Sequence, residues 1–360
     1  MPDLLRDASI RRILMIKWSA LGDIAMASCI MEDIHRAFPH ARIDLHTLPP
    51  WDKLFLDDPR FSTIISLDVR ARRHRWSRLW QWVSLVRHNH YDLIVDLQSN
   101  DRSRMMLRLL KLTGNATRYL IGNTPARVYH FSGPPHAMQM NPVERMRMAL
   151  RAAGIPTLTP RPVLHIDAAR RERVAQLCRQ QDLQAGRYAL FYPGCQAAGY
   201  LKRWGEANYA ALARLLIDRQ RVDKVVLIGS QDELEDCRRI VEMAGTGVVN
   251  LCGQTEVLDI VPLAEGACYQ VGNDTGTAHL AASAPVPMAV VCGPTDAYRV
   301  RPQGDNVVAL QADLPCKNCY CKQACDHHTC MRLITPDLVF CALTEPAPVD
   351  RVMMIAVGNR

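Results

Sequence analysis

Residues 266–284 read GACYQVGNDTGTAHLAASA and contain a strand, a turn and a helix in one short stretch. The first part, residues 266–271, is an apolar run suited to a buried strand, and residues 280–284 form a run of small residues suited to a helix. A strand that leads through a tight turn into a helix is the building unit of parallel α/β sheets. This stretch therefore predicts an α/β protein.

The turn within this stretch is a candidate anion site. An Asp-Thr-Gly turn leaves backbone N–H groups unpaired at the positive end of the following helix. Gly276 allows a ligand to approach the backbone closely, and His279 lies one helical turn further on. These residues predict a phosphate or diphosphate site. An ordinary helix capped by Asp274 or Thr275 is the alternative interpretation.

Segments typical of strands and helices alternate along the chain on both sides of a proline-rich stretch, Ile155–Pro162. This stretch is the best candidate for an interdomain linker. A chain of 360 residues is long for one core and suits two domains. The pattern predicts two Rossmann-like halves, which bind ligands at the carboxyl ends of their strands. Further strands are predicted at residues 12–18, 41–48, 91–97, 188–192, 224–228, 248–251 and 287–292.

Composition predicts a soluble globular protein, with 48% hydrophobic and 22% charged residues. Membrane proteins are disfavoured because no apolar run approaches the roughly 18 residues that a spanning helix needs. The N-terminal residues 1–7 are interrupted by charge and lack the apolar core of a signal peptide. We therefore expect a cytoplasmic protein.

The net charge of +8 is unevenly distributed, with a basic and aromatic cluster at residues 70–82. Such a cluster suits an anionic membrane surface or an anionic acceptor. The alternative is a solvated helix whose tryptophans pack inward. Nucleic acid is disfavoured, because no recognisable binding module surrounds the cluster. Its members are Arg70, Arg72, Arg73, His74, Arg75 and Arg78, interleaved with Trp76, Trp80 and Trp82.

An NAD-dependent dehydrogenase is disfavoured, because no Gly-x-Gly-x-x-Gly follows the first strand of either half. Five other short phrases stand out, which are Ile16–Asp23, Tyr192–Gly194, Lys202–Trp204, Asn273–Gly276 with His279, and Gly293–Asp296. In their order and rough spacing, from about residue 12 to about residue 340, they resemble those of the ADP-heptose:lipopolysaccharide heptosyltransferases, glycosyltransferase family 9.

The resemblance implies the GT-B fold, with two Rossmann-like domains whose parallel sheets face an interdomain cleft. It implies that domain 1–163 binds the acceptor and that domain 164–345, which includes the cysteine-rich loop 316–330, binds the nucleotide sugar. Residues 346–360 are expected to form a tail. The implied reaction is inverting, metal-independent transfer of a heptose from ADP-heptose to a lipopolysaccharide inner core. A cytoplasmic protein attached peripherally to the inner membrane fits this reaction.

Asp23 is the candidate catalytic residue. It follows the first predicted strand on a glycine turn, and a single carboxylate can activate an acceptor hydroxyl as a general base. The matching aspartate has this role in the resembling family. The alternative is an aspartate that caps a helix starting at Ile24. In the acceptor domain, Gln98 and Arg102 follow another strand and are candidates for binding an anionic acceptor, although both suit a solvated surface equally well.

Lys202 is the candidate for stabilising the leaving group, because a cation beside the diphosphate offsets the charge that develops as the glycosidic bond breaks. Metal-dependent transferases usually use closely spaced carboxylates, and no convincing pair is present. A surface lysine is the alternative. The other candidate donor-binding residues are Gly22, Gly194, Glu233, Asp274, Thr275, Gly276 and His279.

These donor residues have different expected roles. Thr275, Gly276 and His279 are expected to hold the diphosphate, and Asp274 to orient the loop or contact the sugar. Glu233 lies four residues after Gly229, where a carboxylate accepts hydrogen bonds from ribose hydroxyls in this type of fold. The matching residue of the family does so, and an exposed glutamate at a helix start is the alternative.

The loop 195–201, Cys-Gln-Ala-Ala-Gly-Tyr-Leu, departs from the family pattern. The family often places Ser or Thr here near the phosphates, so backbone N–H groups or Gln196 must replace those hydroxyls. This departure motivates a second hypothesis, a non-catalytic ADP-sugar-binding protein of the same fold.

Five of the 13 cysteines lie within 15 residues, and the others are scattered through apolar stretches. Four thiols suffice for a tetrahedral structural zinc or iron site, and a cytosolic setting disfavours disulfides. Cys316, Cys319, Cys325 and Cys330 are the expected ligands; free thiols are the alternative. A relative that heptosylates autotransporter proteins has an iron-binding cysteine finger, so a protein acceptor is a third hypothesis.

Overall fold

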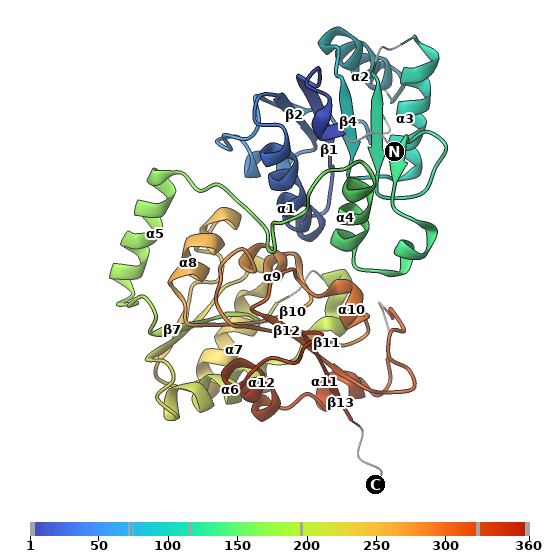
Figure 1. The fold of residues 1–360 in the computed structure, drawn as a ribbon. Helices are drawn as coiled ribbons and strands as arrows, with labels where there is room; N and C mark the ends of the chain where they lie inside the picture. The colour runs from blue at the N-terminus through green and yellow to red at the C-terminus, as the bar shows by residue number, and fades with distance from the viewer. Residues whose placement is uncertain are drawn as a thin grey trace. The chain divides into compact units, whose positions relative to one another are not determined.

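The computed structural model describes residues 4–70, 73, 75–114, 117–194, 197–321 and 325–356. The chain forms two compact units, Met1–His165 and Ile166–Arg360. Each is a parallel sheet covered by helices, so both are Rossmann-like α/β units (Figure 1). Within the described residues, no helix combines the length and the apolar character that crossing a bilayer requires.

The N-terminal unit has a sheet of order β3-β2-β1-β4-β5-β6, and its paired strands are parallel. Helix α1 packs beside α4, and α2 packs beside α3. The strands are β1 (Arg12–Ile16), β2 (Arg42–Thr47), β3 (Thr63–Ser66), β4 (Leu93–Asp96), β5 (Tyr119–Gly122) and β6 (Phe131–Ser132). The helices are α1 (Leu21–Ala37), α2 (Arg75–Asn89), α3 (Asp101–Leu112) and α4 (Pro142–Ala152), with 3-10 turns η1 (Leu4–Arg6), η2 (Trp51–Leu54) and η3 (Pro135–Gln139).

The C-terminal unit has a parallel sheet of order β13-β12-β11-β10-β7-β8-β9. Its strands are β7 (Tyr188–Tyr192), β8 (Lys224–Leu227), β9 (Val248–Asn250), β10 (Tyr269–Asn273), β11 (Met288–Cys292), β12 (Val307–Ala312) and β13 (Val352–Ile355). Its helices are α5 (Ala168–Gln180), α6 (Glu206–Asp218), α7 (Leu234–Ala244), α8 (Ile260–Gly266), α9 (Gly276–Ala281), α10 (Ala297–Val300), α11 (Thr329–Arg332) and α12 (Pro336–Thr344). Its 3-10 turns are η4 (Ala197–Lys202), η5 (Gln231–Glu233) and η6 (Val257–Asp259).

Both sheets reverse their strand order at one point. In the N-terminal unit the chain runs outward from β1 to β3 and then returns to β4, beside β1. In the C-terminal unit it runs from β7 to β9 and returns to β10, beside β7. Open α/β sheets bind ligands beyond the carboxyl ends of the strands at such switch points. The fold therefore directs attention to the loops after β1, β4, β7 and β10.

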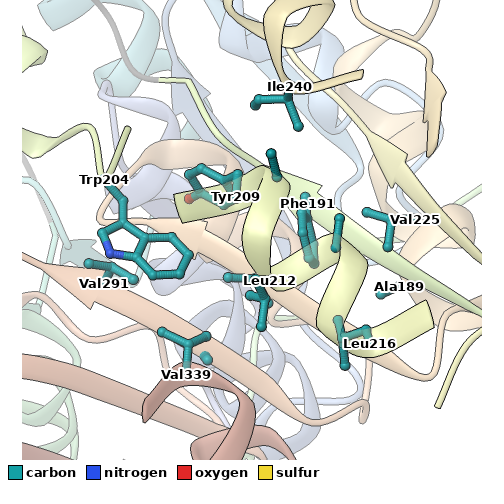
Figure 2. Packing of buried hydrophobic residues seen from close by; sticks show 14 of the residues in the cluster. Ala189, Phe191, Trp204, Tyr209, Leu212, Leu216, Val225, Ile240, Val291 and Val339 are labelled. Carbon is teal, nitrogen blue, oxygen red and sulfur yellow. The ribbon is translucent and has the colours of Figure 1, made fainter. Parts of the chain in front are cut away.

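The C-terminal core forms where α6, α7 and α12 cover one face of the sheet (Figure 2). Tyr209 and Leu212 of α6 pack on Phe191 of β7, and Trp204 contacts Tyr209 edge-to-face at 5.0 Å between ring centroids. All of these side chains are at most 3% exposed. Their burial fixes α6, and with it the segment before α6, against the carboxyl ends of the strands.

The N-terminal core contains an unusual polar cluster around His46 of β2. The indole N–H groups of Trp18 and Trp82 both donate to His46 Nδ1, at 3.2 and 3.0 Å, and His46 Nε2 lies 3.0 Å from the carbonyl oxygen of Leu67. An indole nitrogen can only donate, so Nδ1 accepts and the ring proton is on Nε2. Burial lowers the pKa of His46 from its usual 6.5 to about 4.

This neutral histidine predicts a pH-dependent stability. The free energy contributed by neutral His46 is fully present above about pH 6.5 and is lost as the pH falls towards 4, because the unfolded chain takes up a proton first. The free energy of unfolding should fall by about 3 kcal/mol over this range from this group. Denaturant titrations that follow tryptophan emission at several pH values measure the free energy of unfolding. In His46→Gln this free energy should not show the decrease between pH 6.5 and 4 that His46 causes. An equal pH dependence in both proteins would show that His46 is not the group responsible.

Two segments differ from the expectations. Residues 346–360, expected as a tail, contribute β13, which pairs in parallel with β12 and extends the C-terminal sheet. The predicted linker is tied to the N-terminal unit, because Asp33 of α1 accepts hydrogen bonds from the backbone N–H groups of Leu158 and Thr159 at 3.0 and 2.9 Å. A buried carboxylate that satisfies linker backbone groups holds the linker on α1.

Candidate functional site

The Asp-Thr-Gly turn lies between β10 and α9, at the switch point of the C-terminal sheet. Thr275 is the N-cap of α9, and its hydroxyl accepts a hydrogen bond from the N–H of Ala278 at 3.4 Å. The capped-helix interpretation is therefore correct for the local structure. The cap leaves the N–H groups of Gly276 and Thr277 without a hydrogen-bond acceptor in the helix. The first residues of a helix have no helical carbonyl group one turn earlier to accept from them. These groups can bind an anion.

Lys202 lies beside this turn. Its ammonium group donates to the Asp274 carboxylate at 2.7 Å and lies 3.3 Å from the Asp274 carbonyl oxygen. Thr295 donates to the same carboxylate at 2.9 Å, and His279 Nε2 lies 3.9 Å from its other oxygen. The structure thus brings Lys202 beside Asp274 and His279, which belong to a different segment of the sequence. Lys202 neutralises a carboxylate that would otherwise repel an anion here.

Asn273 holds the loops of this site together, a role that the sequence interpretation missed. Its amide nitrogen donates to the Pro193 carbonyl oxygen at 2.7 Å, and its amide oxygen accepts from the Trp204 N–H at 3.2 Å and the Tyr209 hydroxyl at 3.1 Å. It is fully buried at the last position of β10. An amide directly after an apolar strand was the signal in the sequence, because such a buried group must find partners.

Glu233 lies over the glycine turns that follow β7 and β8. A Cβ atom on Gly194 would lie 1.8 Å from Glu233 Oε1, and one on Gly229 would lie 2.8 Å from Oε2. Ser230 donates to Oε2 through its N–H at 2.7 Å. The glycines are required here because they leave room for this carboxylate. Glu233 is thus held at the carboxyl ends of two adjacent strands, where ribose hydroxyls bind in Rossmann-like folds.

Asp23 lies after β1, at the switch point of the N-terminal sheet. Helix α1 begins at Leu21, so the expectation that it begins at Ile24 is wrong by three residues. Gly22 and Asp23 therefore belong to the first turn of the helix. Asp23 accepts a hydrogen bond from the Ala20 N–H at 3.3 Å and is partly exposed. It caps the helix with one oxygen and remains accessible, so capping and catalysis do not exclude each other.

Lys17 is the second residue that the sequence interpretation did not single out. It directly follows β1 and is 5% exposed. Burial lowers the pKa of its ammonium group, while the carboxylates of Asp23 and Asp96 act in the opposite direction. Burial also raises the pKa of Asp96, which is fully buried and accepts from the Tyr129 hydroxyl at 2.6 Å. A lysine inside an apolar strand was the signal, since a buried cation requires a nearby carboxylate.

The two candidate acceptor residues, Gln98 and Arg102, belong to the segment after β4, next to the turn after β1. Gln98 accepts a hydrogen bond from the Trp18 N–H at 3.0 Å, which joins the loops after β4 and β1. Arg102 donates to the Val69 carbonyl oxygen at 3.2 Å, and the neighbouring Arg70 donates to the Ser19 hydroxyl at 2.8 Å. Two guanidinium groups therefore lie near the Asp23 turn and are available to an anionic acceptor.

The atypical loop 195–201 is described only in part. Cys195 and Gln196 lie outside the described residues, so the proposed replacement of the hydroxyls by Gln196 stays a prediction. Lys202 closes η4, and His328 Nε2 lies 2.7 Å from the carbonyl oxygen of Leu201. The cysteine-rich segment thus contacts the residue directly before Lys202.

The four predicted cysteine ligands are not gathered into a metal site. Among the residues that the structure describes, no group of three or more His, Cys, Asp or Glu side chains is placed to hold a metal ion. Cys316 and Cys319 are exposed. Burial raises the pKa of the Cys330 thiol, and the charges of Cys325, Cys319 and Cys316 raise it further. The structural metal remains a prediction, which elemental analysis of purified protein tests.

The chain matches a family model described as glycosyltransferase family 9 (heptosyltransferase) over residues 77–329. It is 27% identical over 340 residues to lipopolysaccharide heptosyltransferase 1 of Pseudomonas aeruginosa, and the match covers 88% of each chain.

Solved structures of heptosyltransferases have the same fold. ADP-heptose lps heptosyltransferase II of E. coli matches with a TM-score of 0.69 and 23% identity, covering 92% of this chain and 97% of that one. E. coli heptosyltransferase WaaC with ADP-2-deoxy-2-fluoro heptose matches with a TM-score of 0.66 and 21% identity, covering 91% and 98%. The two Rossmann-like units are thus those of the GT-B fold.

Proposed function

Because the chain belongs to glycosyltransferase family 9, the heptosyltransferases, we propose that it moves a heptose from ADP-heptose to a lipopolysaccharide inner core. The observation that carries the proposal is the Lys202–Asp274 pair beside the start of α9, at the switch point of the C-terminal sheet. A cation and free backbone N–H groups at one place suit a diphosphate. The N-terminal unit supplies a carboxylate at its own switch point.

The C-terminal unit binds the donor in this proposal. Glu233 accepts hydrogen bonds from the ribose, and Gly276 and Thr277 donate to the diphosphate. As the bond between the anomeric carbon and the diphosphate oxygen breaks, its electron pair passes to ADP. Lys202 then stabilises a growing negative charge and thereby lowers the barrier.

The N-terminal unit supplies the base. The acceptor hydroxyl oxygen attacks the anomeric carbon on the side opposite to the diphosphate, and its proton passes to the Asp23 carboxylate. One bond forms as the other breaks, so the anomeric configuration inverts. Arg102 and Gln98 are assigned to the acceptor in this proposal, and a lipid-linked acceptor would bring the protein to the inner face of the cytoplasmic membrane.

In this proposal Lys202 and α9 supply the charge stabilisation that a divalent cation supplies in other transferases. The transfer rate should therefore be unchanged by EDTA. A rate assay with and without chelator measures this, with a magnesium-dependent transferase as the positive control. Loss of activity in EDTA that added divalent cation restores would refute the metal-independent scheme.

The position of Glu233 makes a prediction about ADP binding. Glu233→Ala should weaken ADP binding by about 10- to 100-fold, because hydrogen bonds to a charged group contribute about 1.5–3 kcal/mol. Gly194→Ala should act similarly, since the new methyl group would displace the Glu233 carboxylate. Calorimetry with ADP measures both.

The control ligand is 2′,3′-dideoxy-ADP, which lacks the ribose hydroxyls and should bind wild type and Glu233→Ala equally. Gly194→Ala should add little in the Glu233→Ala background, because both changes remove the same contact. Additive effects would show that Gly194 acts independently of Glu233.

The activity itself is tested by ADP release from a panel of ADP-sugars, UDP-glucose and GDP-mannose, each with a deacylated lipopolysaccharide core. ADP-heptose should give the highest kcat/KM. Faster turnover of another donor would overturn the donor assignment. ADP binding without turnover of any donor would favour the non-catalytic protein suggested by the atypical loop 195–201.

A further inference from the structure

We propose that one face of helix α2 docks the N-terminal unit on an anionic phospholipid surface. This α2 face consists of Trp76, Trp80, Ser84, Arg87 and His88. These residues recur at intervals of three and four, so they lie on one side of the helix. The inference rests on the proposed function in one respect, that a lipid-linked acceptor gives the protein a reason to bind a membrane.

The tryptophans of this helix are divided between its two sides. Trp82 is fully buried beneath His46, whereas Trp76 and Trp80 are 62% and 53% exposed. The inward-packing alternative is therefore correct for Trp82 and wrong for the other two. Two large indoles exposed one turn apart form an apolar patch of the kind that marks an interaction site. Indoles favour the headgroup region of membranes, where a ring meets both apolar and polar surroundings.

Helix α2 itself carries basic side chains and no carboxylate. Residues 75–89 include no acidic residue. Arg87 and His88 are exposed near the end of the helix. The helix leads into a depression of about 680 Å³ lined by Ser9, Arg11, Arg12, Arg42, His88, Asn89, His90 and Asp92.

The one carboxylate among those lining residues is already engaged. Asp92 accepts from the backbone N–H groups of Arg11 and Arg12, at 2.9 and 3.0 Å, and pairs with Arg118 at 3.2 Å. The depression therefore presents an excess of positive charge to its surroundings.

The whole N-terminal unit shares this bias. Residues 1–165 contain 24 lysines and arginines against 14 aspartates and glutamates, a formal charge of +10. Residues 166–360 contain 20 against 22, a formal charge of −2. An anionic surface therefore attracts the N-terminal unit and not the C-terminal one. Aromatic residues and basic charge on one helix face are the combination that binds anionic bilayers.

Sedimentation with vesicles tests the proposal on the full chain without any acceptor. The protein should bind vesicles of phosphatidylcholine with phosphatidylglycerol, bind phosphatidylcholine alone much more weakly, and dissociate as salt is raised. The Trp76→Ala/Trp80→Ala double variant should bind at least about tenfold more weakly. Arg87→Gln/His88→Gln should weaken binding and reduce its salt dependence.

Leu158→Ala is the control, since Leu158 is 77% exposed on the same unit and its backbone is bound to Asp33 of α1. It should bind vesicles like wild type. Equal vesicle binding by wild type and the tryptophan double variant would overturn the proposal. A change of the double variant to a smaller oligomer in light scattering would also overturn it, and would make the α2 face a contact between copies of the chain.

A parallel assay with ADP-heptose and a deacylated, soluble core separates this proposal from the proposed function. The tryptophan double variant should keep wild-type kcat in that assay. Vesicle binding by a wild-type protein that transfers no sugar would refute the activity but leave the docking face standing.

Discussion

Replacing Asp23 by asparagine should lower kcat by about 10²- to 10⁴-fold, the usual contribution of a general base. Asparagine keeps an oxygen that can accept from the Ala20 N–H, so the start of α1 is retained while the basic carboxylate is lost. Steady-state ADP release with saturating donor and acceptor measures the effect. The affinity for ADP should be unchanged, because the residues assigned to the ribose and the diphosphate, Glu233 and Gly276–Thr277, belong to the other unit.

Asp101→Asn is the control, because Asp101 also lies in the first turn of a helix of the N-terminal unit but is fully solvent-exposed. It should leave kcat unchanged. The base assignment is wrong if Asp23→Asn keeps more than about a tenth of wild-type kcat, because that is less than general bases contribute.

Replacing Lys202 by methionine should lower kcat by about 10²- to 10³-fold, comparable to the loss of one donor from an oxyanion site. Methionine preserves much of the length of the side chain but removes the charge. ADP should also bind more weakly, since Asp274 loses its ion-pair partner at 2.7 Å and its negative charge then repels the diphosphate. Rapid-quench kinetics and calorimetry measure the two effects separately.

A second substitution distinguishes these two consequences. Asp274→Asn in the Lys202→Met background should restore part of the ADP affinity, because it removes the uncompensated carboxylate, but should not restore kcat. If the double variant regained kcat as well, Lys202 would serve only to neutralise Asp274. If neither single variant changed kcat, Lys202 would have no role at the leaving group.

Most central strands were predicted from the sequence, but position in the sheet does not explain every outcome. The edge strand β9 was predicted at residues 248–251, whereas the inner strands β5 and β12 were not. Ile13–Ile16 and Tyr188–Tyr192 were recognisable because they are apolar runs that neighbouring strands and helices bury. The edge strand β13 includes half-exposed positions and follows a loop, so its short run resembles a tail. Its backbone hydrogen bonds to β12 stabilise the strand, and composition does not reveal this pairing.

The site was predictable where a chemical group follows a strand directly. Asp23 and Asp274 were singled out in this way, because ligands of open α/β sheets bind beyond the carboxyl ends of the strands. Asn273 and Lys17 were missed because each lies at the end of an apolar strand, where the sequence does not show which distant loop the side chain contacts.

Spacing alone does not decide whether the cysteine-rich segment binds a metal. Four thiols in 15 residues satisfy the count for a tetrahedral site. Ligand geometry depends on the path of the backbone between them, and Asn318, Tyr320 and His328 all have positive φ angles. Such a path turns side chains in directions that spacing does not encode.

The structure of the reaction product tests whether the protein transfers a heptose with inversion. Purified protein is incubated with ADP-heptose and a deacylated inner core that lacks heptose, and the product is characterised by mass spectrometry and NMR. The account predicts one heptose added to the core, with an anomeric configuration opposite to that in the donor. An unmodified core beside consumed donor, or a product with the donor's configuration, would contradict it.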